Sequence, residues 1–350
     1  MILNKYDSAF FDRLLQTDYA FAVWRRPNSS NVEAVFCRQD DIVECQQIDE
    51  RTDGFVFAPF ETSAKCPIYV FPDRQVVPAG QSQASANDGE ALKERCATHQ
   101  TYLQKLEALL LQISADVPKV VLSRCQWHSQ RNQAVVPSLF SKLCELQPEA
   151  FVYMVSIPKM GCWAGASPEL LLSVQGGKCA TVALAGTQPA DCVRWTDKEK
   201  DEQQWVARHI SDILNDENII FTKSDTYTSK TGTLAHLRTD FSFNIVNNGQ
   251  IGRLVSRLHP TPAICGLPVA KARHLLKQIE GYDRQYYSGF VGPISGNDAM
   301  LYVNIRCLQA FSNGLMLYAG GGITASSVPE SEWNETELKL TNLSRIFDKL

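Results

Sequence analysis

The chain has 350 residues, of which 44% are hydrophobic and 21% are charged, and its formal net charge is −4. This is the composition of a globular protein, and the small net charge argues against nucleic acid or an anionic membrane surface as a partner. No apolar run approaches the roughly 20 residues that a membrane-spanning helix needs, and the first residues lack the apolar segment of a signal peptide.

Cysteine is the one unusual count in this composition. The chain has 11 cysteines, an odd number, scattered without CxxC spacing. Reduced, mostly buried thiols in a cytoplasmic protein explain this pattern best. Because no His or Cys ligand spacing accompanies them, the sequence does not predict a zinc site.

The first half of the chain favours strands, with one long helix. Short apolar runs over residues 1–75 predict antiparallel strands. Residues 80–90, rich in small polar residues, predict an exposed loop. Helical periodicity follows over residues 90–113, and a short strand is expected at 119–123.

The second half mixes helices and strands without regular alternation. Residues 239–247 fit either structure. The other expected elements are a helix at 138–146, a strand at 151–157, further strands over 161–187, a helix at 197–215, a strand at 219–221, a helix at 271–280, a strand at 311–319 that ends in three glycines, and a last helix at 330–350. This order favours an α+β fold with large, mostly antiparallel sheets.

Two acidic pairs stand out in the expected helices. Glu199 with Glu202, and Glu332 with Glu335, are spaced i,i+3, so each pair lies on one helix face. Three of the four fall on the apolar stripe of their helix, and Glu335 lies at its border. Buried carboxylates are costly without positive partners, and no cluster of Lys and Arg matches them nearby in the sequence. We therefore predict a bound divalent cation; solvated helix faces remain the alternative on this pattern alone.

Ten short motifs place these pairs in a wider context. They are Lys119-Val-Val-Leu-Ser-Arg124, Gly165-Ala-Ser-Pro-Glu-Leu170, Leu184-Ala-Gly-Thr187, Lys198-Glu-Lys-Asp-Glu202, His236-Leu237, His259-Pro-Thr-Pro-Ala263 with Gly266, Glu280 with Arg284 and Tyr287-Ser-Gly289, Ile305-Arg306, Ala319-Gly-Gly-Gly-Ile323, and Glu332-Trp-Asn-Glu-Thr336 with Lys339. Over roughly residues 115–345, this ordered set resembles the chorismate-utilising enzymes. That family includes isochorismate, anthranilate, aminodeoxychorismate and salicylate synthases.

The resemblance implies one large α+β domain over residues 1–350. It has two subdomains with stacked antiparallel sheets, outer helices and an active site in the cleft between them. Residues 1–95 match no motif and are expected to form a divergent, strand-rich part. Residues 96–350 are expected to form the catalytic core.

Three positions favour one member of the family. Lys119 stands where isochorismate and salicylate synthases have Lys and the ammonia-using synthases typically have Gln, which cannot act as the base that an attacking water needs. Ala185 replaces the Lys of one type of aminodeoxychorismate synthase. Ala263 stands where salicylate synthases usually have Thr. We therefore expect an isochorismate synthase, of menaquinone or siderophore type, that converts chorismate reversibly by water attack at C2 and loss of the C4 hydroxyl.

The same motifs also occur in enzymes with other activities. A salicylate synthase, which adds pyruvate elimination, is the first alternative, and an ammonia-using anthranilate or aminodeoxychorismate synthase component is a weaker one. A non-catalytic chorismate-binding protein would be a different class altogether. The expected partner is the substrate chorismate, and no glutaminase subunit is expected.

The resemblance also implies roles for individual residues. Lys119 is the expected base and Glu169 the acid that protonates the departing hydroxyl, which requires burial to raise the pKa of Glu169. Mg²⁺ is expected on Glu202 and Glu335, with Glu199 and Glu332 as further or water-mediated ligands. Arg306 and the backbone near Gly320 are expected to bind the enolpyruvyl carboxylate. The predicted substrate-binding residues are Thr187, His236, Ala263, Tyr287, Arg306, Gly320 and Lys339.

Two of these residue assignments have structural alternatives, and the chain differs from the family pattern at two positions. His236 could equally be a structural histidine, and the three glycines could be a plain turn. Relatives usually have Glu-His where this chain has Glu202-Gln203, and often Arg where Gln188 stands.

Overall fold

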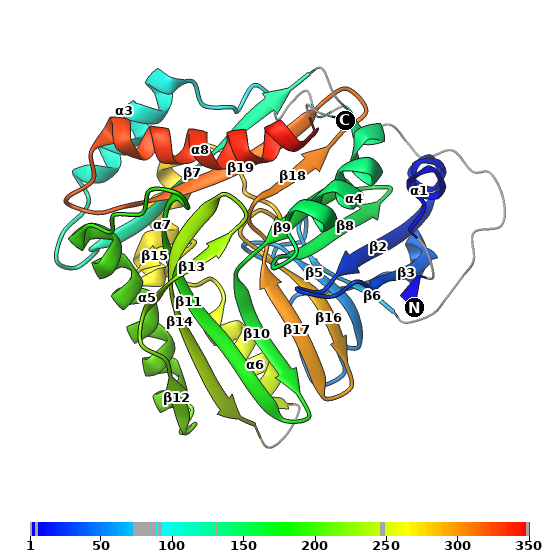
Figure 1. The fold of residues 1–350 in the computed structure, drawn as a ribbon, viewed down its shortest axis with the longest axis horizontal. Helices are drawn as coiled ribbons and strands as arrows, with labels where there is room; N and C mark the ends of the chain where they lie inside the picture. Colours follow the sequence, from blue (N-terminus) through cyan, green and yellow to red (C-terminus); the bar gives the residue numbers. More distant parts are fainter. Residues whose placement is uncertain are drawn as a thin grey trace.

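Two antiparallel sheets form the centre of the molecule, with helices on their outer faces (Figure 1). The structure is a computed structural model, and it describes residues 2–3, 6–72, 89, 93–129, 132–245, 249–347 and 350. The α+β class and the stacked antiparallel arrangement expected from the sequence are therefore confirmed.

The first sheet has nine strands. In spatial order they are β1 (Ile2–Leu3), β3 (Val32–Arg38), β2 (Tyr19–Arg25), β8 (Phe151–Ile157), β9 (Gly161–Ser167), β18 (Cys307–Ala310), β19 (Leu315–Ile323), β7 (Lys119–His128) and β15 (Gly266–Leu267). Near its edge, β7 pairs with β19 along its length, so Val120 lies opposite Ile323.

The second sheet has ten strands. In spatial order they are β12 (Phe221–Lys223), β14 (Leu234–Asn244), β11 (Lys178–Pro189), β10 (Leu170–Gln175), β17 (Asp298–Val303), β16 (Phe290–Ser295), β5 (Gly54–Ala58), β6 (Ile68–Phe71) and β4 (Val43–Cys45), with β13 (Tyr227–Thr231) paired to β14. Strands from the first 75 residues thus contribute to both sheets.

Helices cover both sheets. On the first sheet lie α1 (Ser8–Leu14), α4 (Val136–Leu146) and α8 (Pro329–Phe347), and α3 (His99–Leu110) and α7 (Val269–Ile279) pack beside β7. The second sheet is covered by α5 (Asp197–Asp216) and α6 (Gly249–Leu258).

Burial on both faces explains why the central strands are apolar throughout. In β8, Tyr153 and Val155 face the aromatic core between the sheets, whereas Val152 and Met154 face the helices. A strand alternates its side chains between two faces, and here both faces are covered. Across the inter-sheet core, Phe151 stacks on Tyr302 of the second sheet with ring centroids 4.8 Å apart.

Several predicted elements are corrected by the structure. Within residues 1–75, the segment Ser8–Leu14 is a helix, because Asp7 caps it by accepting from the Ala9 N–H and its apolar face is buried. Of the helix expected over residues 90–113, residues 90–92 lie outside the described residues, residue 93 is helical, and after an interruption α3 begins at His99, where Thr98 caps it. The loop expected at 80–90 lies outside the described residues, apart from Gly89.

The C-terminal half shows further differences. The predicted strand at 219–221 is β12 at Phe221–Lys223, and the ambiguous segment from residue 239 is the end of β14. Helix α6 was not predicted. Gly320–Gly322 continue β19 instead of ending it, so the reading of the three glycines as a turn is wrong.

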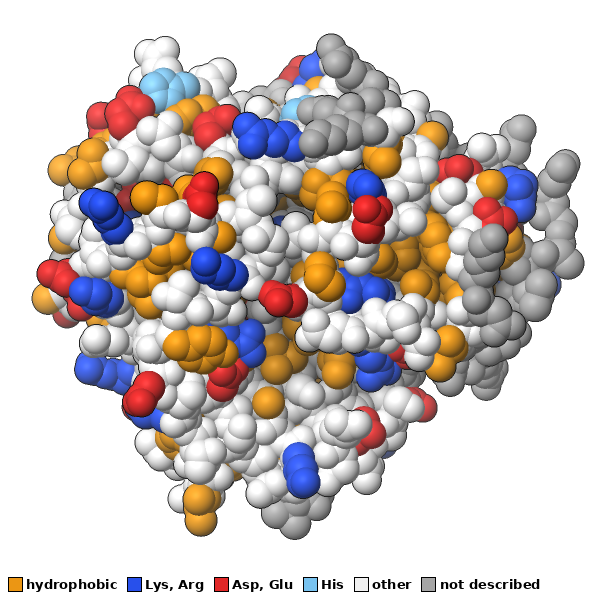
Figure 2. Space-filling view, viewed as in Figure 1, with side chains coloured by type: hydrophobic (Ala, Val, Ile, Leu, Met, Phe, Trp, Pro, Cys, Tyr) orange, Lys and Arg blue, Asp and Glu red, His pale blue; other side chains and the backbone are white. Residues whose placement is uncertain are grey.

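Charges are mixed on the visible surface. On the face shown in Figure 2, acidic and basic side chains are interspersed. Among the helices of the described part, none is both long and apolar enough to cross a membrane. All 11 cysteines lie in described segments and are free thiols, and most are buried.

Candidate active site

One pocket collects side chains from both sheets and two helices. Strands β7 and β19 contribute from the first sheet, β11 and β14 from the second, and α5 and α8 close the pocket. The predicted site residues that line it are Lys119, Glu169, Thr187, Glu202, His236, Ala263, Tyr287, Arg306, Gly320, Glu335 and Lys339. Glu199 and Glu332 are not among the lining residues.

Glu169 is buried where the chain passes from β9 to β10. The Thr261 hydroxyl lies 3.4 Å from its Oε1 and can donate to it. Burial raises the pKa of Glu169 to about 7, although Lys119, Thr261, Lys339 and Arg306 act in the opposite direction. The carboxyl group therefore holds a proton over a large part of the neutral range, as a general acid requires.

Lys119 begins β7 and is almost completely buried. Its Nζ lies 3.2 Å from Glu202 Oε2. Both side chains press against the neighbouring strand at Gly322. A methyl group at that position would lie 2.3 Å from Glu202 Oε2 and 3.0 Å from Lys119 Cε, so only glycine leaves room for the pair.

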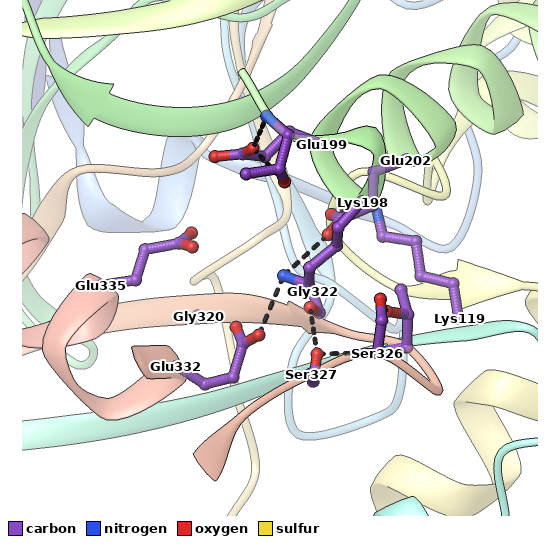
Figure 3. Close-up of polar contacts among 12 residues, drawn as sticks. Lys119, Lys198, Glu199, Glu202, Gly320, Gly322, Ser326, Ser327, Glu332 and Glu335 are labelled. Atoms are coloured by element: carbon purple, nitrogen blue, oxygen red, sulfur yellow. Dashed lines mark hydrogen bonds and ion pairs between the residues drawn. The ribbon is translucent and has the colours of Figure 1, made fainter. Parts of the chain in front are cut away.

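A second lysine lies among the acidic side chains. Figure 3 shows Lys198 between Glu202 and Glu332, with its Nζ 3.0 Å from Glu202 Oε1 and 2.8 Å from Glu332 Oε1. Lys198 is thus a positive partner of the acidic pairs, contrary to the expectation that no Lys or Arg nearby in the sequence matches them. The i,i+4 spacing of Lys198 and Glu202 was the signal that could have revealed it.

Glu199 has a different environment from the other three acidic residues. Its Oε2 accepts from the Thr196 N–H at 2.7 Å and from the Thr196 hydroxyl at 2.6 Å, and its Oε1 accepts from Gln188 Nε2 at 2.5 Å. This is a capping box at the start of α5. Glu199 therefore caps the helix in this structure, and a role beside a cation stays a prediction.

The remaining carboxylates suit a hard divalent cation. Glu332 Oε2 is buried without a hydrogen-bond partner among the described residues, which is the environment of an oxygen that awaits a cation or a water. Glu335, one turn along α8, is half-buried and is paired through Oε1 with Lys339 at 2.7 Å. Carboxylate oxygens are the donors that Mg²⁺ prefers. Among the described residues, no three potential ligands are already gathered as a metal site.

His236 and Arg306 form a hydrogen-bonded pair in the pocket. His236 Nδ1 lies 2.6 Å from the Gly186 carbonyl, so Nδ1 carries the proton, and Nε2 accepts from Arg306 Nη2. Burial, together with the Arg306 charge, holds the pKa of His236 well below its ordinary value. Burial lowers the pKa of Arg306 to about 10, which still leaves it charged at neutral pH. A neutral histidine therefore orients a charged guanidinium.

The pocket floor brings Tyr287, Lys339 and the backbone of β19 together. Lys339 Nζ donates to the Gly320 carbonyl at 2.7 Å. A methyl group at Gly320 would lie 3.1 Å from the Tyr287 hydroxyl, so that ring approaches the strand closely. Thr187 and Ala263 complete the lining.

The two departures from the family pattern have local explanations. Gln203 is buried, donates to the Thr239 hydroxyl at 2.7 Å and accepts from Thr226. Gln188 exchanges hydrogen bonds with the backbone of Arg194. Neither side chain lines the pocket, so both act on the scaffold around it.

Comparison with known proteins gives a consistent result. Isochorismate synthase EntC of Escherichia coli K12 is 28% identical over 313 residues, which are 83% of this chain and 79% of that protein. The vibriobactin-specific isochorismate synthase of Vibrio cholerae is 29% identical over 64% of this chain and 60% of its own length.

Solved structures share the fold. MenF, the menaquinone-specific isochorismate synthase of Escherichia coli, superposes with a TM-score of 0.76 at 18% identity, covering 96% of this chain and 90% of that one. Anthranilate synthase component I of Streptococcus pneumoniae gives 0.65 at 16% identity, covering 94% and 91%. The family model of chorismate binding enzymes matches residues 73–348, so this chain belongs to the chorismate binding enzyme family.

Proposed function

We propose that the chain is an isochorismate synthase, which converts chorismate to isochorismate in a reversible hydroxyl transfer. One observation carries the assignment: a lysine at position 119 lies in the same buried pocket as a carboxyl group, Glu169, whose pKa is about 7. We assign the proton-donating role to Glu169 and the proton-accepting role to Lys119. The isochorismate synthases among the relatives support the same conclusion.

The residues have distinct tasks in this proposal. Lys119 accepts a proton from the water whose oxygen bonds to C2 of the ring. Glu169 gives its proton to the C4 oxygen as the C4–O bond breaks, so one water enters and one leaves. Arg306, oriented by His236, binds a substrate carboxylate as a planar donor. Thr187, Ala263, Tyr287 and the Gly320 backbone shape the remaining wall.

A divalent cation completes the proposed site. Glu202 and Glu335 would hold Mg²⁺, with Glu332 beside them, and the cation supplies positive charge for the ring carboxylate of the substrate. The orphaned oxygen of Glu332 supports this part of the proposal. We further propose that the enzyme needs no glutaminase subunit, because its nucleophile is water. A cytoplasmic location remains a prediction from the cysteine content.

The test is to incubate the purified protein with chorismate and Mg²⁺ and to separate the products by chromatography. A parallel reaction contains EDTA, and a third contains ammonium at raised pH. We expect isochorismate to form until it is in equilibrium with chorismate. It should form only in reactions in which Mg²⁺ is not chelated by EDTA. Salicylate with pyruvate as main products, or an aminated product in the third reaction, would overturn the assignment.

A further inference from the structure

Lys198 occupies an unusual place for a cationic side chain. It is the second residue of α5, in the first turn, where the helix dipole disfavours positive charge. Its ammonium group nevertheless lies within 3.0 Å of carboxylates on two helices, Glu202 of α5 and Glu332 of α8. These carboxylate side chains are only 7% and 3% exposed, so they depend on nearby positive charge.

The same two carboxylates belong to the proposed cation site. An ammonium group and a divalent cation repel each other, and each would lie against oxygens of Glu202 and beside Glu332. Lys198 therefore fills, in this structure, the position from which a cation would join α5 to α8 (Figure 3). This agrees with the finding that, in the described part of the chain, no three ligand groups are yet gathered around a common point.

The side chain has a route out of the site. The Lys198 side chain is 18% exposed, far more than the two carboxylates that it contacts, so part of it already reaches solvent. Lysine carries a compact charge on a flexible four-carbon stem and can place that charge in water while the stem stays on the protein.

We propose that Lys198 is a resident counter-ion of the cation site. Its ammonium group holds Glu202 and Glu332 together while the metal is absent, and it leaves these oxygens when a divalent cation binds. Lys198 is thus a positioning residue that sets the metal affinity of the enzyme. The inference rests on the cation site of the proposed function, and its test needs no turnover.

The first experiment titrates Mg²⁺ into the protein by calorimetry without chorismate. Lys198→Met keeps the length of the stem and removes the charge, so we expect about ten-fold or greater tightening of Mg²⁺ binding. In thermal unfolding, the metal-free variant should melt below the metal-free wild type, because Glu332 has lost its ion-pair partner and Glu202 keeps only Lys119. Added Mg²⁺ should raise its melting temperature more than that of the wild type.

Two matched variants separate the local effect from the change in total charge. Lys200→Met removes the same charge two residues along α5, from a half-exposed side chain paired only with Asp197 in the described surface. We expect its Mg²⁺ affinity to stay within about two-fold of the wild type. Lys198→Arg keeps the positive charge, so its Mg²⁺ affinity should be weaker than that of Lys198→Met and close to that of the wild type.

A second measurement uses the wild type alone, so it stands even where a variant fails to fold. Brief acetylation followed by mass spectrometry reports how exposed each lysine is, with Lys200 as the internal reference. We expect saturating Mg²⁺ to accelerate acetylation of Lys198 relative to Lys200.

Specific results would overturn the inference. They are unchanged or weaker Mg²⁺ binding in Lys198→Met, absence of Mg²⁺ binding in both proteins, or acetylation of Lys198 that is indifferent to Mg²⁺. A protein that binds Mg²⁺ as expected but leaves chorismate unchanged would contradict the proposed function and not this inference.

Discussion

Burial favours the neutral form of two side chains in the pocket. Glu169 becomes a weaker acid, with a pKa of about 7, and so keeps its proton. His236 becomes a weaker base and gives its proton up, which leaves Nε2 free to accept from Arg306. The same physical cause thus prepares a proton donor and a hydrogen-bond acceptor in one pocket.

The first prediction concerns Glu169→Gln. Loss of the general acid should lower kcat about 10²- to 10⁴-fold with a smaller change in KM, measured as initial rates with chorismate. Glu107→Gln, an exposed carboxylate on α3, is the control and should keep wild-type activity. A Glu169→Gln variant with near-normal kcat would remove Glu169 from the mechanism.

The same variant should change how stability depends on pH. The folded state raises the pKa of Glu169 from 4.5 to about 7, so the folded protein binds this proton more tightly than the unfolded chain does. Stability linked to this proton is present below the unfolded pKa and is lost as the pH rises through about 7. Between pH 5 and pH 8 the wild type should therefore lose about 2–3 kcal/mol relative to Glu169→Gln, measured by urea unfolding. Parallel pH dependence of the two proteins would contradict the raised pKa.

At the scale of helices and strands, two contacts between packed elements fix the geometry of the site. Strand β19 presents Gly322 to Lys119 and Glu202, and strand β7 presents Arg124 to helix α8. Each contact joins residues that lie far apart in the sequence. The positions of the acidic side chains therefore depend on how closely the strands and helices approach.

Gly322→Ala should separate catalysis from folding. The added methyl group would meet Glu202 Oε2 at 2.3 Å, whereas the one added by Gly321→Ala would lie at an ordinary contact distance of 3.4 Å from its nearest neighbour, Glu332 Oε2. We expect about 100-fold or greater loss of kcat/KM for Gly322→Ala and less than about five-fold for Gly321→Ala, with both variants folded by circular dichroism. Equal losses would show that the clash with Glu202 is not what makes glycine necessary at position 322.

Arg124 is predicted to anchor the helix that carries Glu332 and Glu335. Its Nε donates to the Thr336 hydroxyl at 2.7 Å, its guanidinium stacks 3.8 Å from the Trp333 ring, and it pairs with Glu337. Arg124→Met should cost about 2–4 kcal/mol in urea unfolding, since a buried charged donor and a cation–π contact are lost. Glu337→Gln should cost less than about 1 kcal/mol, because that carboxylate is partly exposed. Similar losses of unfolding free energy in the two variants would show that Arg124 anchors α8 through its ion pair with Glu337 alone.

At the scale of the whole molecule, α5 and α8 come from distant parts of the chain and would share one cation. Binding to the folded state alone stabilises the fold by mass action. At about 100 times the dissociation constant, Mg²⁺ should add about 2.7 kcal/mol and raise the melting temperature of a 350-residue protein by about 4 °C. KCl of equal ionic strength is the control, and an equal rise with KCl would contradict a specific site.

The sequence predicted which residues line the pocket better than it predicted the ion pairs between them. Motif residues such as Glu169 and Arg306 could be recognised individually, and they do line one pocket. The bridge from Lys198 to Glu332 could not be seen, because it joins residues 134 positions apart in the chain, through packing that local patterns do not encode.

The limits on predicting the fold have a similar physical origin. Long apolar strands such as β8 were predicted with their correct bounds, since burial on both faces leaves an unbroken apolar run. The sequence does not reveal the short helix α1, because seven residues are too few for helical periodicity to emerge. The glycine pattern predicts the end of a strand at 320–322, although close side chains at Gly320 and Gly322 are what favour glycine in this continuing strand.

The order of the strands has a consequence for how this protein is made. Lys119 begins β7, whose partners in the sheet are β15 at Gly266–Leu267 and β19 at Leu315–Ile323. A growing chain therefore carries an apolar strand that lacks its long partner, β19, until residue 323 has been synthesised. Such pairing between segments far apart in the sequence is slow and leaves folding intermediates that are prone to aggregate. Chaperone supply during translation, more than the final stability of the fold, should govern how much active protein a cell obtains.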